Sequence, residues 1–112
     1  MSHSYYDDLV GSSPTPVSAS EHTVERIHTD TRVNVVRIAL PAGGELADNK
    51  ARNPVIIQAL SGSVRFRIDG EELTLRPGGW IHVSARQPHA LEAREPTVLL
   101  ITMLKGVGLD GE

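Results

Sequence analysis

The chain has 112 residues, a formal net charge of −3 and no cysteine, which is room for a single domain. The missing cysteines exclude disulfides and thiolate ligands, and charges of both signs are interspersed without the basic stripe that a nucleic-acid partner requires. No run approaches the roughly 20 apolar residues of a membrane span. The first residues lack the basic and apolar segments of a signal peptide, so we expect a cytoplasmic protein that binds neither nucleic acid nor membrane.

Residues 1–20 contain Gly11, Pro14, Pro16 and several serines, a mixture that predicts an N-terminal arm without regular structure. The globular domain is then expected over residues 21–112. The arm also carries larger side chains, and our hypothesis is that these dock on the domain or on a second subunit. They are Tyr5, Tyr6, Leu9 and Val10.

From about residue 23 the sequence alternates short β-branched, apolar runs with Gly and Pro turns, and it contains no convincing amphipathic helix. The predicted strands cover residues 24–28, 32–40, 55–60, 64–68, 80–83, 88–93 and 97–104. Turns every eight to twelve residues favour an antiparallel sandwich or jelly roll. The last strand, TVLLITML, is apolar on both faces. Its outer face needs a cover, so a homodimer is expected.

One hairpin can be predicted with its register. Asp69-Gly70 is a favoured two-residue hairpin turn, and it is preceded by VRFRI and followed by EELTL. This register places apolar residues opposite each other on one face and opposite charges on the other. The predicted pairs are Val64 with Leu75, Phe66 with Leu73, and Arg67 with Glu72.

The segment from Gly78 to His89 reads GGWIHVSARQPH, a glycine turn, a strand, a bend and then a histidine. It resembles the second conserved motif of the cupin superfamily, as found in small RmlC-like proteins of the conserved-barrel type. The resemblance covers roughly residues 33–104. It implies an all-β fold, the antiparallel double-stranded jelly-roll β-barrel. In that family the histidine that falls at His89 is one of four metal ligands.

The other three ligands of the family come from a first motif, two histidines and a glutamate placed before a glycine. Counting back from Gly62 puts these positions at Asn49, Ala51 and Val55. Alanine and valine cannot bind a metal, and an amide oxygen is a poor ligand for soft or borderline ions. The metal motif is therefore degenerate and no cofactor is expected. A rearranged metal site would have to combine His89 with His82, Asn49 or Asp48.

His89 remains the main candidate for chemistry, either as a general base or as a group that grips a ligand. Asn49, His82 and Trp80 are the further candidates for ligand binding. Trp80 and His82 share one strand face, so both join His89 if that face lines the barrel. In the alternative, they lie on the outer face or at a subunit contact. Arg37, in an apolar strand, is expected to pair with a carboxylate at the dimer contact or to guard the barrel mouth against an anion.

Four functions are compatible with these residues. The preferred interpretation is a barrel that binds a small, mainly apolar molecule without a metal. A metal-free isomerase resembling the sugar-epimerase branch of the family would use His89 as its base, but that branch also employs an acid and a core tyrosine. A metalloenzyme with a rearranged site is the third possibility. The fourth is a sensor or scaffold whose dimer surface is the working part.

Overall fold

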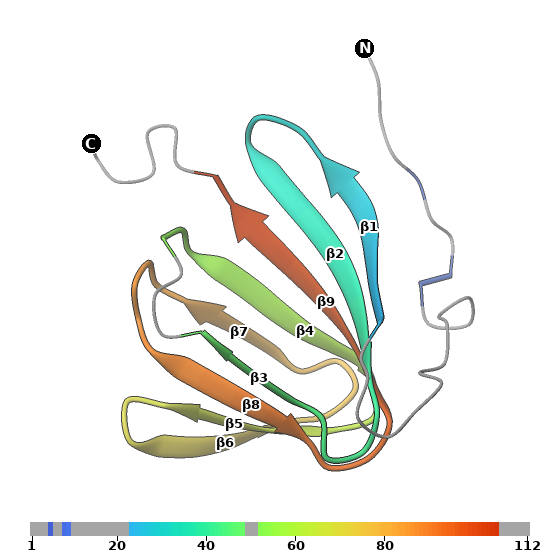
Figure 1. Ribbon diagram of the computed structural model, residues 1–112, viewed down its shortest axis with the longest axis vertical. Coiled ribbons are helices and arrows are strands. Elements are labelled where there is room, and N and C mark those ends of the chain that lie inside the picture. The colour runs from blue at the N-terminus through green and yellow to red at the C-terminus, as the bar shows by residue number, and fades with distance from the viewer. Residues whose placement is uncertain (1–4, 6–7, 10–22, 49–51, 106–112) are drawn as a thin grey trace.

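The computed structural model of the protein describes residues 5, 8, 9, 23–48 and 52–105 (Figure 1). Strands make up the regular structure of this part of the chain, and it contains no helix that could cross a membrane. The strands are β1 (Thr23–Thr29), β2 (Val33–Leu40), β3 (Glu45–Asp48), β4 (Val55–Ser61), β5 (Val64–Ile68), β6 (Glu71–Leu75), β7 (Trp80–Val83), β8 (His89–Ala93) and β9 (Thr97–Leu104).

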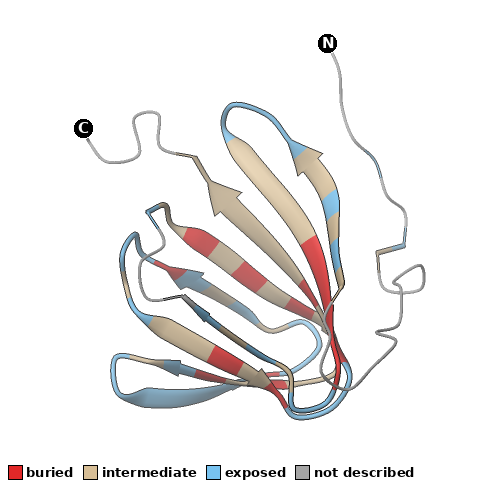
Figure 2. Cartoon of the chain, viewed as in Figure 1, coloured by how far each residue is buried: buried red, intermediate tan, exposed pale blue. Residues whose placement is uncertain are grey.

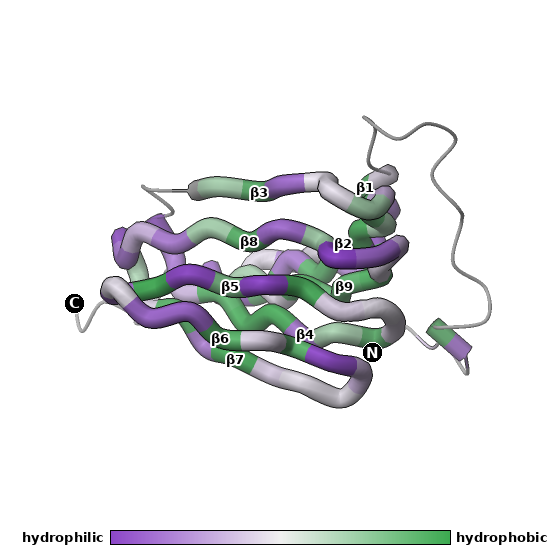
Figure 3. Tube along the Cα trace, turned by 90° about the horizontal axis from the view of Figure 1, so that it is seen from below, coloured by the Kyte–Doolittle hydropathy of each residue, from purple (hydrophilic) through white to green (hydrophobic). Residues whose placement is uncertain are grey.

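The strands form two antiparallel sheets that face each other (Figures 1 and 3). One sheet has the order β1-β2-β9-β4-β7, and the other has the order β3-β8-β5-β6. Several neighbours in each sheet are distant in sequence, as in β2 beside β9 and β5 beside β8. This arrangement confirms the predicted all-β jelly-roll barrel.

The hairpin of β5 and β6 has the predicted register, with Val64 opposite Leu75 and Phe66 opposite Leu73. Asp69 and Gly70 both have positive φ, of 55° and 76°, as a type I′ turn requires. Arg67 lies opposite Glu72, and its Nε donates to Glu72 Oε2 over 3.4 Å. Leu73 remains 37% exposed because β6 is the edge strand of its sheet.

β3 is the strand that the sequence did not predict. It is only four residues long, ELAD, and two of them are acids, which are uncommon in strands. It forms because every one of its residues pairs with β8, from Glu45 opposite Glu92 to Asp48 opposite His89. Its strand character comes from this pairing and not from its own composition.

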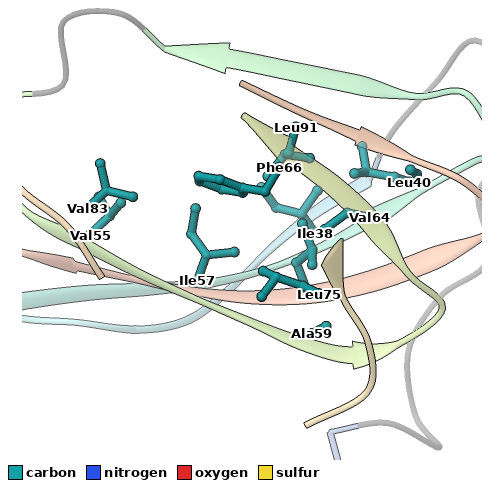
Figure 4. Packing of buried hydrophobic residues seen from close by; sticks show 12 residues of the cluster. Ile38, Leu40, Val55, Ile57, Ala59, Val64, Phe66, Leu75, Val83 and Leu91 are labelled. Carbon is teal, nitrogen blue, oxygen red and sulfur yellow. The ribbon is translucent and has the colours of Figure 1, made fainter. Parts of the chain in front are cut away.

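Alternating side chains from both sheets fill the space between them. On β4, Val55, Ile57 and Ala59 are buried, while their neighbours are only partly covered (Figure 2). Phe66 and Leu91 reach in from the four-stranded sheet toward Ile38 and Ile57 of the five-stranded sheet (Figure 4). The inward faces of the two sheets therefore make one hydrophobic core.

The barrel is packed more densely at one end than at the other. Along β2 the residues change from partly buried in the first half to buried in the second half, which ends at Leu40. β9 runs antiparallel to β2 and is best buried at its beginning, around Thr97 and Leu99. We call the end that holds Leu40 and Thr97 the closed end. The opposite end, where β4 and β8 begin, is the open end.

Candidate functional site

A cavity of about 250 Å³ lies between the sheets toward the open end, and we call it the lumen. For comparison, a cavity of about 150 Å³ lined by apolar side chains is enough to hold benzene. Of the ten described residues that line it, histidine is the one polar residue. The lining residues are Val36, Ile38, Leu46, Ala47, Val55, Ile57, His89, Leu91, Ile101 and Met103.

His89 is the first residue of β8 and brings its imidazole to the lumen. Its Nδ1 lies 3.1 Å from the carbonyl oxygen of Gln87. Its ring stacks on the ring of Phe66, with centroids 5.6 Å apart and planes 5° from parallel. The orientation of the imidazole is therefore fixed both by a hydrogen bond and by packing.

The contact with Gln87 also determines which ring nitrogen carries the proton. A carbonyl oxygen can only accept a hydrogen bond, so Nδ1 must donate. In the neutral imidazole, Nε2 is then an acceptor. Within the described residues, no hydrogen-bond partner is found for Nε2 of His89. A molecule bound in the lumen can supply that partner.

The residues at the family's metal-ligand positions do not fit a metal. Val55, at the glutamate position, is buried and lines the same lumen as His89. Asn49 and Ala51 lie outside the described residues, as does the side chain of Asp48, whose backbone pairs with His89 in the β3–β8 ladder. The described residues contain no group of three or more His, Asp or Glu side chains that could hold an ion. One imidazole does not make a catalytic metal site, which usually needs three protein ligands.

Trp80 and His82 do not join His89: of the two alternatives for their strand face, the structure has the outer one. In the β4–β7 ladder Trp80 pairs with Gln58 and His82 with Ile56, whereas the buried residues Val55 and Ile57 pair with Val83 and Ile81. Alternation along β7 then sends Trp80 and His82 to the outer face, and the side chain of Trp80 is 57% exposed.

Arg37 also lies on the outer face of the five-stranded sheet, away from the barrel mouth. Only 3% of its surface is exposed. Its Nε and Nη2 donate to Glu25 Oε1, with the Nε contact at 3.0 Å. Its Nη1 donates to the backbone carbonyl of Leu9 over 2.8 Å. The expected pairing with a carboxylate is confirmed, with a glutamate of the same chain, while its place at a dimer contact stays a prediction.

The contact between Arg37 and Leu9 tests part of the hypothesis about the N-terminal arm. Leu9 is partly buried and its carbonyl is held by Arg37, so this point of the arm docks on the sheet of its own domain. Tyr5 is exposed and does not dock on its own domain, and a contact with a second subunit stays a prediction. Tyr6 and Val10 lie outside the described residues, and their role stays a prediction.

His28 lies near the end of β1, beside the turn that leads to β2. Its Nε2 lies 2.9 Å from Asp30 Oδ2, and Asp30 Oδ1 accepts from the backbone N–H groups of Arg32 and Val33. The hydrogen bond from His28, followed by those from Val33 and Arg32, holds the pKa of Asp30 well below its usual value. His28 therefore has a local partner at this turn.

Sequence reasoning missed one polar residue on the inward side of the barrel. Asn34 shares a face of β2 with Val36 and Ile38 and lies opposite Met103 of β9. Its Oδ1 is buried and accepts no hydrogen bond from any described residue. The signal was present in the sequence, because Asn34 is the only polar residue on that face of an otherwise apolar strand. A buried unpaired amide of this kind calls for an explanation.

The sequence comparison agrees with this architecture. Residues 36–104, more than half of the chain, match the Cupin domain family. The protein therefore belongs to the cupin family, as the Gly78–His89 motif indicated. No protein with a curated description matches the sequence.

Solved structures resemble the chain over nearly its whole length. A conserved protein of unknown function from Streptococcus pyogenes is 21% identical, with a TM-score of 0.79 over 96% of this chain and 92% of that one. An RmlC-like cupin from Desulfovibrio desulfuricans is 20% identical, with a TM-score of 0.78 over 91% and 97%. The cupin domain of an XRE family transcriptional regulator from Enterobacter cloacae is 19% identical, with a TM-score of 0.70 over 77% and 98%. At these identities the likeness establishes the fold.

Proposed function

We propose that the protein binds a small, mainly apolar molecule in the lumen, without a metal. The observation that carries this proposal is a cavity of about 250 Å³ whose described lining residues are apolar apart from His89. Enclosed apolar pockets with few convergent polar groups are the usual form of small-molecule sites. Burial of apolar ligand surface supplies the affinity there, at roughly 25 cal/mol per Å².

The lumen gives less support to acid–base catalysis by His89. A general base of an isomerase needs a second group that returns the proton on the other side of the substrate. Among the side chains that the structure describes, no carboxylate or tyrosine contacts His89, and Glu92 of the same strand turns outward to Arg65, 3.9 Å away. The metal-dependent alternative is disfavoured by Val55, which stands where the family has a carboxylate.

Filling the lumen should abolish binding. We expect Val55→Phe to prevent p-xylene from binding, because the added ring occupies space that a bound hydrocarbon needs. Ile56→Phe is the matched control: Ile56 is the next residue on β4, pairs with His82 and faces the other way. It should leave p-xylene binding within about twofold of wild type. Calorimetric titration or ligand-observed NMR measures both variants.

Two outcomes would contradict the proposed function. The first is a wild-type protein that binds neither p-xylene nor p-cresol up to their solubility limits. The second is stoichiometric metal in protein purified without added metal, measured by elemental analysis and lost in His89→Ala. That result would favour the metal-dependent alternative over a metal-free binding barrel.

A homodimer in the cytoplasm is the second part of the proposal. Register places Val35, Ile56 and Leu100 on the outer face of the five-stranded sheet, with Trp80 at the exposed edge. The arm reaches this face at Arg37 through Leu9. An apolar sheet surface of this kind suits a second copy of the chain. Light scattering should give the mass of two chains for wild type and of one chain for Leu100→Arg, and a monomeric wild type would refute the dimer.

A further inference from the structure

We propose that the ligand of the lumen is an uncharged, compact apolar molecule that carries an O–H or N–H hydrogen-bond donor, and that His89 Nε2 accepts from it. The inference rests on the proposed function and adds the chemical class of the ligand. A phenol or a cyclic alcohol with a short apolar substituent belongs to this class.

The first argument is the polarity of His89. Nδ1 donates to the Gln87 carbonyl, so in the neutral ring the single N–H lies on Nδ1 and is hydrogen-bonded to the backbone. The stack on Phe66 holds the plane of the ring, and turning the ring over within that plane would break the hydrogen bond to Gln87. Nε2 is therefore the nitrogen left for a bound molecule, and it presents a lone pair. A ligand that offers only acceptors, such as an ether or a ketone, leaves that lone pair without a partner.

The second argument comes independently from Asn34. Its buried Oδ1 lies on the same inward strand face as the lining residues Val36 and Ile38 and also accepts no hydrogen bond from a described residue. Oδ1 of Asn34, like Nε2 of His89, is a hydrogen-bond acceptor. Among the described residues, the buried Oδ1 of Asn34 and the lone pair of His89 Nε2 therefore call for the same complement, a donor.

The third argument concerns charge. Among the residues that the structure describes, no arginine or lysine lines the lumen. Arg37 is paired with Glu25 on the outer face of one sheet, and Arg65 and Arg67 pair with glutamates on the outer face of the other. A carboxylate or phosphate that entered the lumen would lose its hydration without gaining a cation. The ligand is therefore neutral in its bound form.

The experiment compares p-cresol with p-xylene, two rings of almost equal shape of which only the first carries a donor. Calorimetry measures the Kd of each for wild type, His89→Leu, His89→Gln and His82→Leu. Hydrocarbons enter any apolar pocket more readily than phenols. The quantity to follow is therefore the ratio of the p-xylene Kd to the p-cresol Kd within each protein, and how that ratio changes between proteins.

We expect His89→Leu to lower this ratio about tenfold by weakening p-cresol binding alone. His89→Gln, which keeps an acceptor, should have a ratio between those of His89→Leu and wild type. His82→Leu, a histidine on the outer face, should leave it unchanged. An unchanged ratio in His89→Leu, with p-xylene still bound, would overturn this inference while leaving the proposed function intact. If His89→Leu does not fold, His89→Phe takes its place. A ratio of the p-xylene Kd to the p-cresol Kd that is lower in His89→Phe than in His89→Gln supports the inference, and equal ratios overturn it.

Discussion

Phe66→Ala is expected to lower the free energy of unfolding by about 3–5 kcal/mol, the usual cost of deleting a buried aromatic ring. Phe66 is 0% exposed and lies in the middle of β5, with its side chain between the two sheets (Figure 4). Close-packed neighbours from both sheets can refill only part of the space that the ring leaves. Urea unfolding monitored by circular dichroism measures the change.

Leu73→Ala is the matched control for Phe66→Ala. Leu73 lies directly opposite Phe66 in the hairpin but is 37% exposed on the edge strand, so we expect a loss below about 1 kcal/mol. Equal losses in the two variants would mean that the ring of Phe66 is not the buried centre of this sheet.

Phe66 also stacks on the imidazole of His89. In Phe66→Leu, which keeps the core filled better, p-cresol should therefore lose affinity more than p-xylene does.

Gly62→Ala is expected to cost about 2–4 kcal/mol of unfolding free energy, from two effects that add. Gly62 has a φ of +78°, where any residue with a Cβ is strained. A Cβ at this position would also meet the carbonyl oxygen of Pro96, Thr97 Oγ1 and, at 2.6 Å, Thr97 Cα. Backbone atoms cannot move aside as a flexible side chain does.

Thr97 makes relief of this clash still harder. It is buried, and its Oγ1 accepts from the N–H of Ser63 over 3.1 Å and lies 2.8 Å from the carbonyl of Glu95. Moving it away from residue 62 would break these hydrogen bonds. This glycine is thus the place where the β4–β5 turn and the start of β9 touch at the closed end.

Gly70→Ala separates the two effects. Gly70 has a similar φ of +76°, but a Cβ there would have no atom within 4 Å. We expect a loss of about 1 kcal/mol, from backbone strain alone. Thermal or urea unfolding of both variants gives the difference. If Gly62→Ala cost no more than Gly70→Ala, the close approach of residues 62 and 97 would be disproved.

The fold could be predicted largely because its signals are local. The alternation of VRFRI and EELTL around Asp69-Gly70 determines one register only, since a shift by one residue would expose Phe66. The spacing from Gly78 to His89 identified the family, and the count back from Gly62 placed Val55 correctly in the lumen. Each of these inferences needed only residues that are close in sequence.

The missed features depend on contacts between distant segments. β3 becomes a strand because β8 pairs with it, and the sequence ELAD alone does not predict this pairing. Trp80 and His82 alternate with Ile81 and Val83, so apolar residues occur on both faces of β7, and only pairing with β4 decides which face is buried. The proton position on His89 follows from a backbone carbonyl whose direction no sequence pattern reports. Asn49 lies outside the described residues and stays a prediction.

The contrast between the closed and open ends has a consequence for how this barrel can change over evolution. Leu40, Gly62 and Thr97, which are buried or tightly confined, lie at the closed end. Val36, Ile101 and Met103 line the lumen and are only partly buried. Substitutions among them can reshape the ligand site while the other end keeps the chain folded. New ligand preferences are therefore accessible by single mutations, without a stabilising change having to come first.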